Sequence, residues 1–167
     1  GEAPIKNVVF RNIVEETNRT IGLETGELDI IYDIQGLDKN KLRDDERFVL
    51  IEGPQVSMTY LGFNMKKAPY DNPKVREAIS YAIDQKPIID AVFLGGGEAA
   101  NSIIGPNIWG YYDVEKYTQD IEKAKALLTE AGYPNGFKAK IWVNDNPVRR
   151  DTAVILQDQL KQIGIDL

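Results

Sequence analysis

The chain has 167 residues, of which 43% are hydrophobic and 28% charged, and its formal net charge is −6. That length is enough for one compact domain or two small lobes with a buried core. The chain contains neither histidine nor cysteine, which excludes disulfides, thiolate metal sites and a Ser-His-Asp or Cys-His nucleophile built within it. The acidic excess argues against a nucleic-acid partner, because phosphate binding needs clustered Lys and Arg.

The first part of the chain alternates short predicted strands with short predicted helices. Apolar content predicts strands over 6–13, 28–32, 48–51 and 56–64, and helices over 15–27 and 37–45. In the last of these strands neither set of alternating residues is clearly polar, which favours a strand covered on both faces.

Longer helices are predicted after Asn64. The pair Asn72-Pro73 is typical of a helix start, and an apolar stripe follows from Val75 to Ile83. Further helices are predicted from Lys86-Pro87 to the Gly95–Gly97 run, over 120–131 and over 147–163, with a strand over 137–143. A β segment begins at 165–167, so we expect the chain to be part of a longer protein.

Two segments are candidates for ligand contact. Trp109 and Tyr111 lie in a loop introduced by Gly105-Pro106; loop aromatics either stack on a ligand or pack into the gap between a helix and a sheet. Asn144 and Asn146 follow a strand end, where α/β proteins bind ligands, although Asn146 could simply cap the next helix.

The charged and glycine-rich motifs allow fewer functional interpretations. Arg149-Arg150 lies in the first turn of a predicted helix, where the helix dipole favours acidic residues. The two arginines are therefore expected either to bind an anionic ligand or to form surface ion pairs. The Gly95–Gly97 run follows a helix and lacks the Gly-Lys-Ser/Thr of a phosphate loop, so it predicts a helix end. The consecutive acids Asp44–Glu46 do not form a paired-carboxylate site.

Several longer motifs are familiar. The segments Tyr60–Asn64, Lys67–Ile79, Tyr81–Asp84, Ala100–Pro106, Trp109–Tyr111, Ala124–Leu128 and Glu130–Phe137 resemble the signature of family 5 extracellular solute-binding proteins. These are the oligopeptide, dipeptide and nickel receptors of ABC importers. Upstream, Arg19 and Leu23–Ile30 match the segment that the family places before its hinge, so the resemblance covers essentially the whole chain.

The resemblance implies an α/β fold of the type II periplasmic-binding-protein kind, present here as incomplete lobes with mixed sheets flanked by helices. Residues 1–62 correspond to the end of a first lobe up to the crossover, and 63–167 to the first part of a second lobe. The resemblance implies a periplasmic or extracellular protein that is associated with the cell surface, and lipoproteins are among the proteins of this kind. The membrane is reached only through a tether or permease outside this chain.

The implied function is the capture of peptides or other small solutes for ABC permease subunits, without catalysis, cofactor or metal. The short loop Asn144–Pro147 resembles oligopeptide-type members rather than the dipeptide branch, and the absence of histidine excludes nickel binding through a local histidine. A carboxylate-based hydrolase is the alternative. The candidate ligand-binding residues are Tyr60, Asn64, Trp109, Tyr111, Asn144, Asn146 and Arg149.

Overall fold

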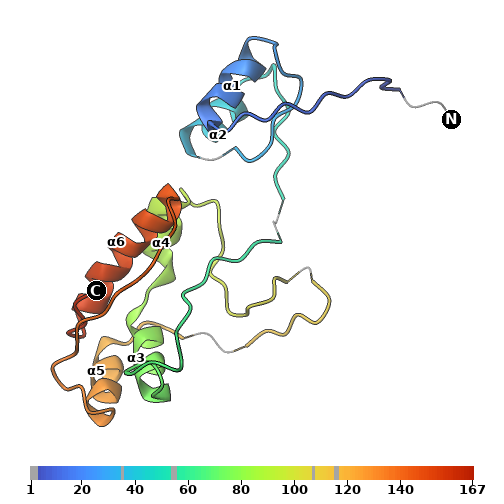
Figure 1. The fold of residues 1–167 in the computed structure, drawn as a ribbon. Helices are drawn as coiled ribbons and strands as arrows, with labels where there is room; N and C mark the ends of the chain where they lie inside the picture. The colour runs from blue at the N-terminus through green and yellow to red at the C-terminus, as the bar shows by residue number, and fades with distance from the viewer. Residues whose placement is uncertain (1–3, 35, 54–55, 107, 115–116) are drawn as a thin grey trace. The chain divides into compact units, whose positions relative to one another are not determined.

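The computed structural model describes residues 4–34, 36–53, 56–106, 108–114 and 117–167. The chain divides into two compact units, Gly1–Glu52 and Gly53–Leu167, and each is described by itself. The helices of the described residues follow one another as α1 Glu16–Glu24, α2 Gly36–Arg43, α3 Pro73–Ala82, α4 Gln85–Val92, α5 Ile121–Glu130 and α6 Pro147–Lys161 (Figure 1).

The first unit is built around α1 and α2. Thr20 and Leu42 are the most buried of its described side chains, each 2% exposed. The Arg19 guanidinium donates to the carbonyl oxygens of Ile13, Val14 and Asp33 at 2.9, 3.0 and 3.1 Å. One side chain of α1 therefore fastens the segments before and after the helix to each other.

The four helices of the second unit begin where their capping residues predict. The side chains of Asn72, Asp84, Asp120 and Asn146 each accept a hydrogen bond from a backbone N–H in the first turn of α3, α4, α5 and α6. A cap satisfies one of the N–H groups that the start of a helix leaves unpaired. The predicted helix starts at Asn72-Pro73 and Asp120 are thereby confirmed.

The predicted apolar stripes form the core of the second unit. Helix α3 packs against α5, and α6 contacts both α3 and α4 (Figure 1). The buried cluster consists of Val75, Ala78, Ile79, Ala82, Ala124, Leu128, Leu160, Ile163 and Ile165. Three of the predicted helices thus pack by the faces that their sequence periodicity indicates.

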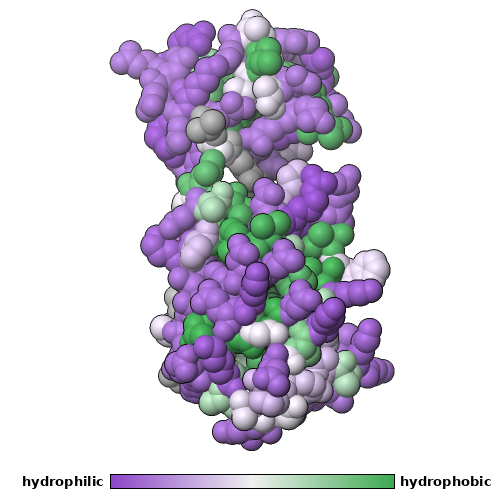
Figure 2. Space-filling view, turned by 90° about the vertical axis from the view of Figure 1, so that its left-hand side faces the viewer, coloured by the Kyte–Doolittle hydropathy of each residue, from purple (hydrophilic) through white to green (hydrophobic). Residues whose placement is uncertain are grey.

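The predicted sheets are not observed in the described residues. Lys138 and Asp166 form one isolated parallel bridge, and the other segments predicted as strands are without ladder partners. A helix pairs its own backbone groups, whereas a strand exists only beside a second strand. Apolar side chains of these segments stay exposed, with Val9 82%, Ile51 89% and Trp142 89% accessible. Figure 2 shows hydrophobic residues reaching the surface among hydrophilic ones on one face of the molecule.

Candidate functional site

The segment from Trp142 to Arg149 connects an extended stretch to α6. The Asn146 N–H donates to the Asn144 carbonyl oxygen at 2.8 Å, which forms a tight turn. Asn146 Oδ1 accepts from the Arg149 N–H at 3.2 Å, so the capping role considered for Asn146 is confirmed. The Asn144 side chain is exposed and is unpartnered among the described residues, which leaves an amide free for a ligand.

The two arginines at the start of α6 differ in their surroundings. Arg150 forms an ion pair with Asp145 at 2.5 Å, the surface partner that one interpretation of the pair predicts. Arg149 is exposed, and its guanidinium has no partner within the part of the chain that the structure describes. Of the two arginines, Arg149 is therefore the one available to a carboxylate, which a guanidinium can hold through two parallel hydrogen bonds.

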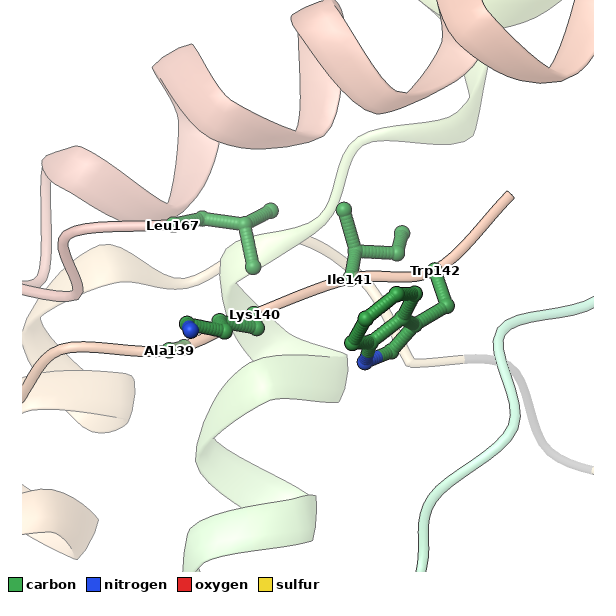
Figure 3. Close-up of a pocket in the computed structure, with 5 residues that line it drawn as sticks. All are labelled: Ala139, Lys140, Ile141, Trp142 and Leu167. Carbon is green, nitrogen blue, oxygen red and sulfur yellow. The ribbon is translucent and has the colours of Figure 1, made fainter. Parts of the chain in front are cut away.

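A shallow hollow of about 370 Å³ lies beside the extended stretch, lined by Ala139, Lys140, Ile141, Trp142 and Leu167 (Figure 3). At one end of the extended stretch the backbone pairs in parallel with the C-terminal segment. There the Ala139 N–H donates to the Asp166 carbonyl oxygen at 2.8 Å. In Figure 3 the Ile141 and Leu167 side chains border the hollow, and the Trp142 indole extends from its end. This surface is mostly apolar, with Lys140 as its charged residue, and the Asn144–Asn146 turn follows it directly in the sequence.

Trp109 lies at the corner of a second turn. The Tyr111 N–H donates to the Ile108 carbonyl oxygen at 3.1 Å, and Gly110 has φ +89°. The Trp109 side chain is 98% exposed and so does not plug a gap in the core. Tyr111, by contrast, is half-buried, and the side-chain oxygens of Asn101 and Asp113 share the one proton of its hydroxyl at 3.3 and 3.4 Å. Desolvation and the Asp113 carboxylate hold the pKa of Tyr111 above its ordinary value of 10.0.

Tyr60 and Asn64 lie in the extended segment before α3. Tyr60 is 76% exposed. Asn64 Oδ1 accepts from the Lys66 N–H at 3.1 Å, so this side chain also serves the turn that follows. A free hydroxyl and a partly used amide are what this segment offers to a ligand.

The candidate residues all belong to the second unit, but no hydrogen bond, ion pair or ring contact links the Trp109 turn to the Asn144–Asn146 turn in the described residues. Their convergence on one rim stays a prediction. Nor does any cluster of three or more acidic side chains there have the placement to hold a metal ion. None of the helices in the described part of the chain is both long and apolar enough to cross a membrane.

Sequence reasoning did not single out two polar side chains that organise this unit. Asn101 bridges Tyr111 and the Val114 carbonyl oxygen, and Gln159 pairs with both backbone groups of Asp84. Asn101 stands in the motif Ala100–Pro106, but nothing there indicates its partners. Gln159 interrupts an otherwise apolar stripe of α6, which is the one sequence signal that it carries.

Comparison with known sequences finds relatives that are named for the solutes they bind. It is 39% identical to heme-binding protein A of Haemophilus influenzae, covering 99% of this chain and 31% of the relative. The dipeptide-binding protein of Escherichia coli is 35% identical over 96% of this chain and 31% of its own. The E. coli glutathione-binding protein GsiB is 31% identical, and the match covers 99% of this chain and 32% of GsiB. The chain thus spans about a third of the length of these relatives.

Solved structures agree in fold. HbpA2 from Haemophilus parasuis matches with a TM-score of 0.82 and 36% identity, over 99% of this chain and 34% of that one. A Pseudoalteromonas dipeptide-binding protein in complex with Met-Leu matches with a TM-score of 0.76 and 32% identity, over 91% and 31%.

The fold and these similarities define a class of protein, the bacterial extracellular solute-binding proteins. The chain belongs to family 5 of that class, whose middle region it matches over residues 1–167.

Proposed function

We propose that the protein carrying this chain is the substrate-binding component of an ABC importer and that it captures peptides, oligopeptides included. The observation that carries the proposal is the match of the entire chain to a family whose members include, by name, receptors for dipeptides and for glutathione. In this proposal residues 1–62 belong to the first lobe and 63–167 to the second. The protein works outside the cytoplasm, delivers its solute to the permease subunits and catalyses no reaction.

The chemistry of the second unit supports a peptide ligand. A peptide presents amide groups, side chains and a terminal carboxylate, and the unit offers groups that complement each of them. Asn144 supplies an amide, Trp109 an aromatic face and Arg149 an unpaired cation. Tyr60 adds a hydroxyl group and Tyr111 an aromatic ring whose hydroxyl is engaged by Asn101 and Asp113, while Asn64 and Asn146 add amides that are partly used in turns.

Domain closure is the proposed mechanism. A solute that contacts both lobes binds the closed arrangement more tightly than the open one and so shifts the population toward it. The permease would then distinguish the loaded protein from the empty one by its shape. No covalent step is needed at any stage.

Haem is the second candidate, because the relative with 39% identity is named a heme-binding protein. Haem iron is commonly held by His, Cys, Met or Tyr, and this chain has no His and no Cys. Within it the possible iron ligands are therefore its 2 Met and 8 Tyr residues. The peptide proposal needs no such ligand.

Calorimetric titration of the whole protein separates the candidates. We expect Met-Leu, longer peptides or glutathione to bind and to be recovered intact, and hemin to bind more weakly than they do. Arg149→Ala should weaken the binding of peptides that have a free C-terminal carboxylate by roughly tenfold. It should leave the binding of the corresponding C-terminal amides unchanged. Tighter binding of hemin than of any peptide would contradict the proposal, and cleaved peptide would favour the hydrolase alternative.

A further inference from the structure

The loop around Trp109 is held in shape by its backbone. The hydrogen bond from the Tyr111 N–H to the Ile108 carbonyl oxygen, 3.1 Å, closes a four-residue turn. Its third residue, Gly110, has φ +89°, while Trp109 is not among the residues with positive φ. A positive φ at the third position alone defines a type II turn, which selects glycine there. The turn therefore sets Trp109 at its outer corner.

Two side chains, Asn101 and Asp113, contact the Tyr111 hydroxyl, and of these Asn101 also reaches a second point of the loop. Asn101 Oδ1 accepts from the Tyr111 hydroxyl at 3.3 Å, and Asn101 Nδ2 donates to the Val114 carbonyl oxygen at 3.3 Å. The amide of Asn101 thus holds the chain just after the turn at two points. Asn101 is itself partly buried, whereas Trp109 is exposed.

The base of the loop is attached to a helix. The Gln85 side chain, at the start of α4, donates from Nε2 to the Ala100 carbonyl oxygen at 3.1 Å. Asn101 is the next residue after Ala100. The hydrogen bonds of Asn101 therefore start from a point that is attached to α4. The sequence of contacts runs from Gln85 through Asn101 and Tyr111 to the Trp109 corner.

We propose that Asn101 is a positioning residue for solute binding, which acts through the Tyr111 hydroxyl to hold the exposed Trp109 indole where it contacts a peptide. The inference rests on the proposed function, because it takes Trp109 as a ligand contact. An exposed indole on a mobile loop loses conformational freedom when it binds, and fixing the turn beforehand reduces that loss. Asn101 and Tyr111 need not touch the solute themselves.

A double-mutant cycle in the whole protein tests the proposal, with Met-Leu and glutathione as probes. Trp109→Ala should weaken binding by roughly 5- to 100-fold, as for an interface anchor. Tyr111→Phe and Asn101→Ala should each weaken it by about two- to tenfold, as for a lost hydrogen bond. In the Trp109→Ala background neither should have a further effect, since their contribution passes through the indole.

The adjacent tyrosine provides a matched control. Tyr112 is 74% exposed, and its hydroxyl has no partner among the described residues. Tyr112→Phe should therefore leave the affinity unchanged. Equal losses from Tyr112→Phe and Tyr111→Phe would overturn the proposal, as would an effect of Tyr111→Phe that persists in the Trp109→Ala background.

Fluorescence anisotropy gives a readout that does not depend on the solute. The chain has 2 Trp residues, so Trp142→Phe leaves Trp109 as the one reporter that the chain contributes. In that background Asn101→Ala and Tyr111→Phe should lower the anisotropy of Trp109, and Tyr112→Phe should not. Unchanged anisotropy would overturn the positioning role. If neither probe binds the unaltered protein, the proposed function fails, while the anisotropy still decides whether Asn101 holds the turn.

Discussion

Gln159 is a buried polar side chain on the core-facing side of α6, 7% exposed. Its Oε1 accepts from the Asp84 N–H at 3.1 Å, and its Nε2 donates to the Asp84 carbonyl oxygen at 3.0 Å. Asp84 also caps α4. One amide therefore pairs with both backbone groups of Asp84 at the joint between α3 and α4.

Gln159→Leu should lower the free energy of unfolding of the second unit by about 1–3 kcal/mol, because it leaves two partly buried backbone groups unpaired. Chemical denaturation followed by circular dichroism measures the change. Gln162→Leu is the matched control, since Gln162 is exposed near the end of the same helix; its effect should stay within about 0.5 kcal/mol. Equal effects of the two substitutions would contradict this account of Gln159.

Asp45 is the residue whose charge the first unit stabilises most clearly. Arg47 donates to Asp45 Oδ1 from Nε at 3.0 Å and to Oδ2 from Nη2 at 2.7 Å. These side-chain hydrogen bonds, followed by the Arg47 backbone N–H, lower the pKa of Asp45 from 3.8 to about 2. Because the pKa is lowered by folding, the stabilisation is complete above about pH 4 and is lost as the pH falls toward 2.

An NMR titration of the Asp45 carboxyl carbon should therefore show a midpoint near 2 in the folded chain. Arg47→Ala removes the guanidinium donors, and the midpoint should rise toward the ordinary value of 3.8. The part of the acid-induced loss of stability that comes from Asp45 should then shrink, because the pKa of Asp45 becomes similar in the folded and unfolded chain. A midpoint that is the same with and without the Arg47 side chain would contradict the assignment.

At the scale of elements, a close backbone approach in the second unit joins the turn after α5 to the turn after α6. A Cβ placed on Gly136 would lie 1.9 Å from the Gly164 carbonyl oxygen, and one on Gly164 would lie 2.9 Å from the Asn135 carbonyl oxygen. Both glycines have positive φ, +72° and +82°. The parallel bridge between Lys138 and Asp166 follows directly from this crossing.

Gly136→Ala should destabilise the second unit by more than 2 kcal/mol, because it combines an unfavourable φ with a clash against backbone that cannot move away cheaply. Gly132→Ala separates the two effects. Gly132 has φ +92° but open space around it, so it should cost only about 1 kcal/mol, the conformational part. Thermal unfolding of the two variants measures the difference, and equal losses would show that the close approach is absent in solution.

Helices and strands differ in how much of them could be predicted from the sequence. The start of α3 is fixed by Asn72 and Pro73, and the end of α5 by Gly132 at φ +92°, all local signals. The extended segment that includes Trp142 has the composition of a strand, yet its pairing depends on residues far away in sequence. The same division holds at the site: Asn146 as a cap was predictable, whereas the bond from Tyr111 to Asn101 required the fold.

At the scale of the whole molecule, each unit has its own buried side chains. Leu42, 2% exposed, belongs to the first unit, and the cluster around Leu128, 1% exposed, consists only of residues of the second. Leu128→Ala should cost the second unit about 2–5 kcal/mol through lost burial and the cavity left behind. Hydrogen exchange should then quicken in α3 and α5 but not in α1. Equal acceleration in α1 would show that the units unfold together.

Solute binding, as proposed above, is the other property that would belong to the whole molecule. The chain spans about a third of the length of its relatives, which are the proteins named for dipeptide, haem and glutathione binding. Its candidate contacts are exposed: Trp109 is 98% accessible and Tyr60 76%. Small-molecule sites bury roughly 70–90% of a ligand's surface, and the shallow hollow beside Trp142 falls short of such enclosure.

We therefore expect the 167-residue chain by itself to bind Met-Leu and glutathione weakly or not at all, and the whole protein to bind at least one of them. The second unit supplies one face of contacts, whereas closure around a ligand requires a second face that moves toward it. Calorimetry of both proteins under the same conditions measures the difference. Micromolar binding by the 167-residue chain, abolished by Trp109→Ala, would show that this surface is a complete site without closure.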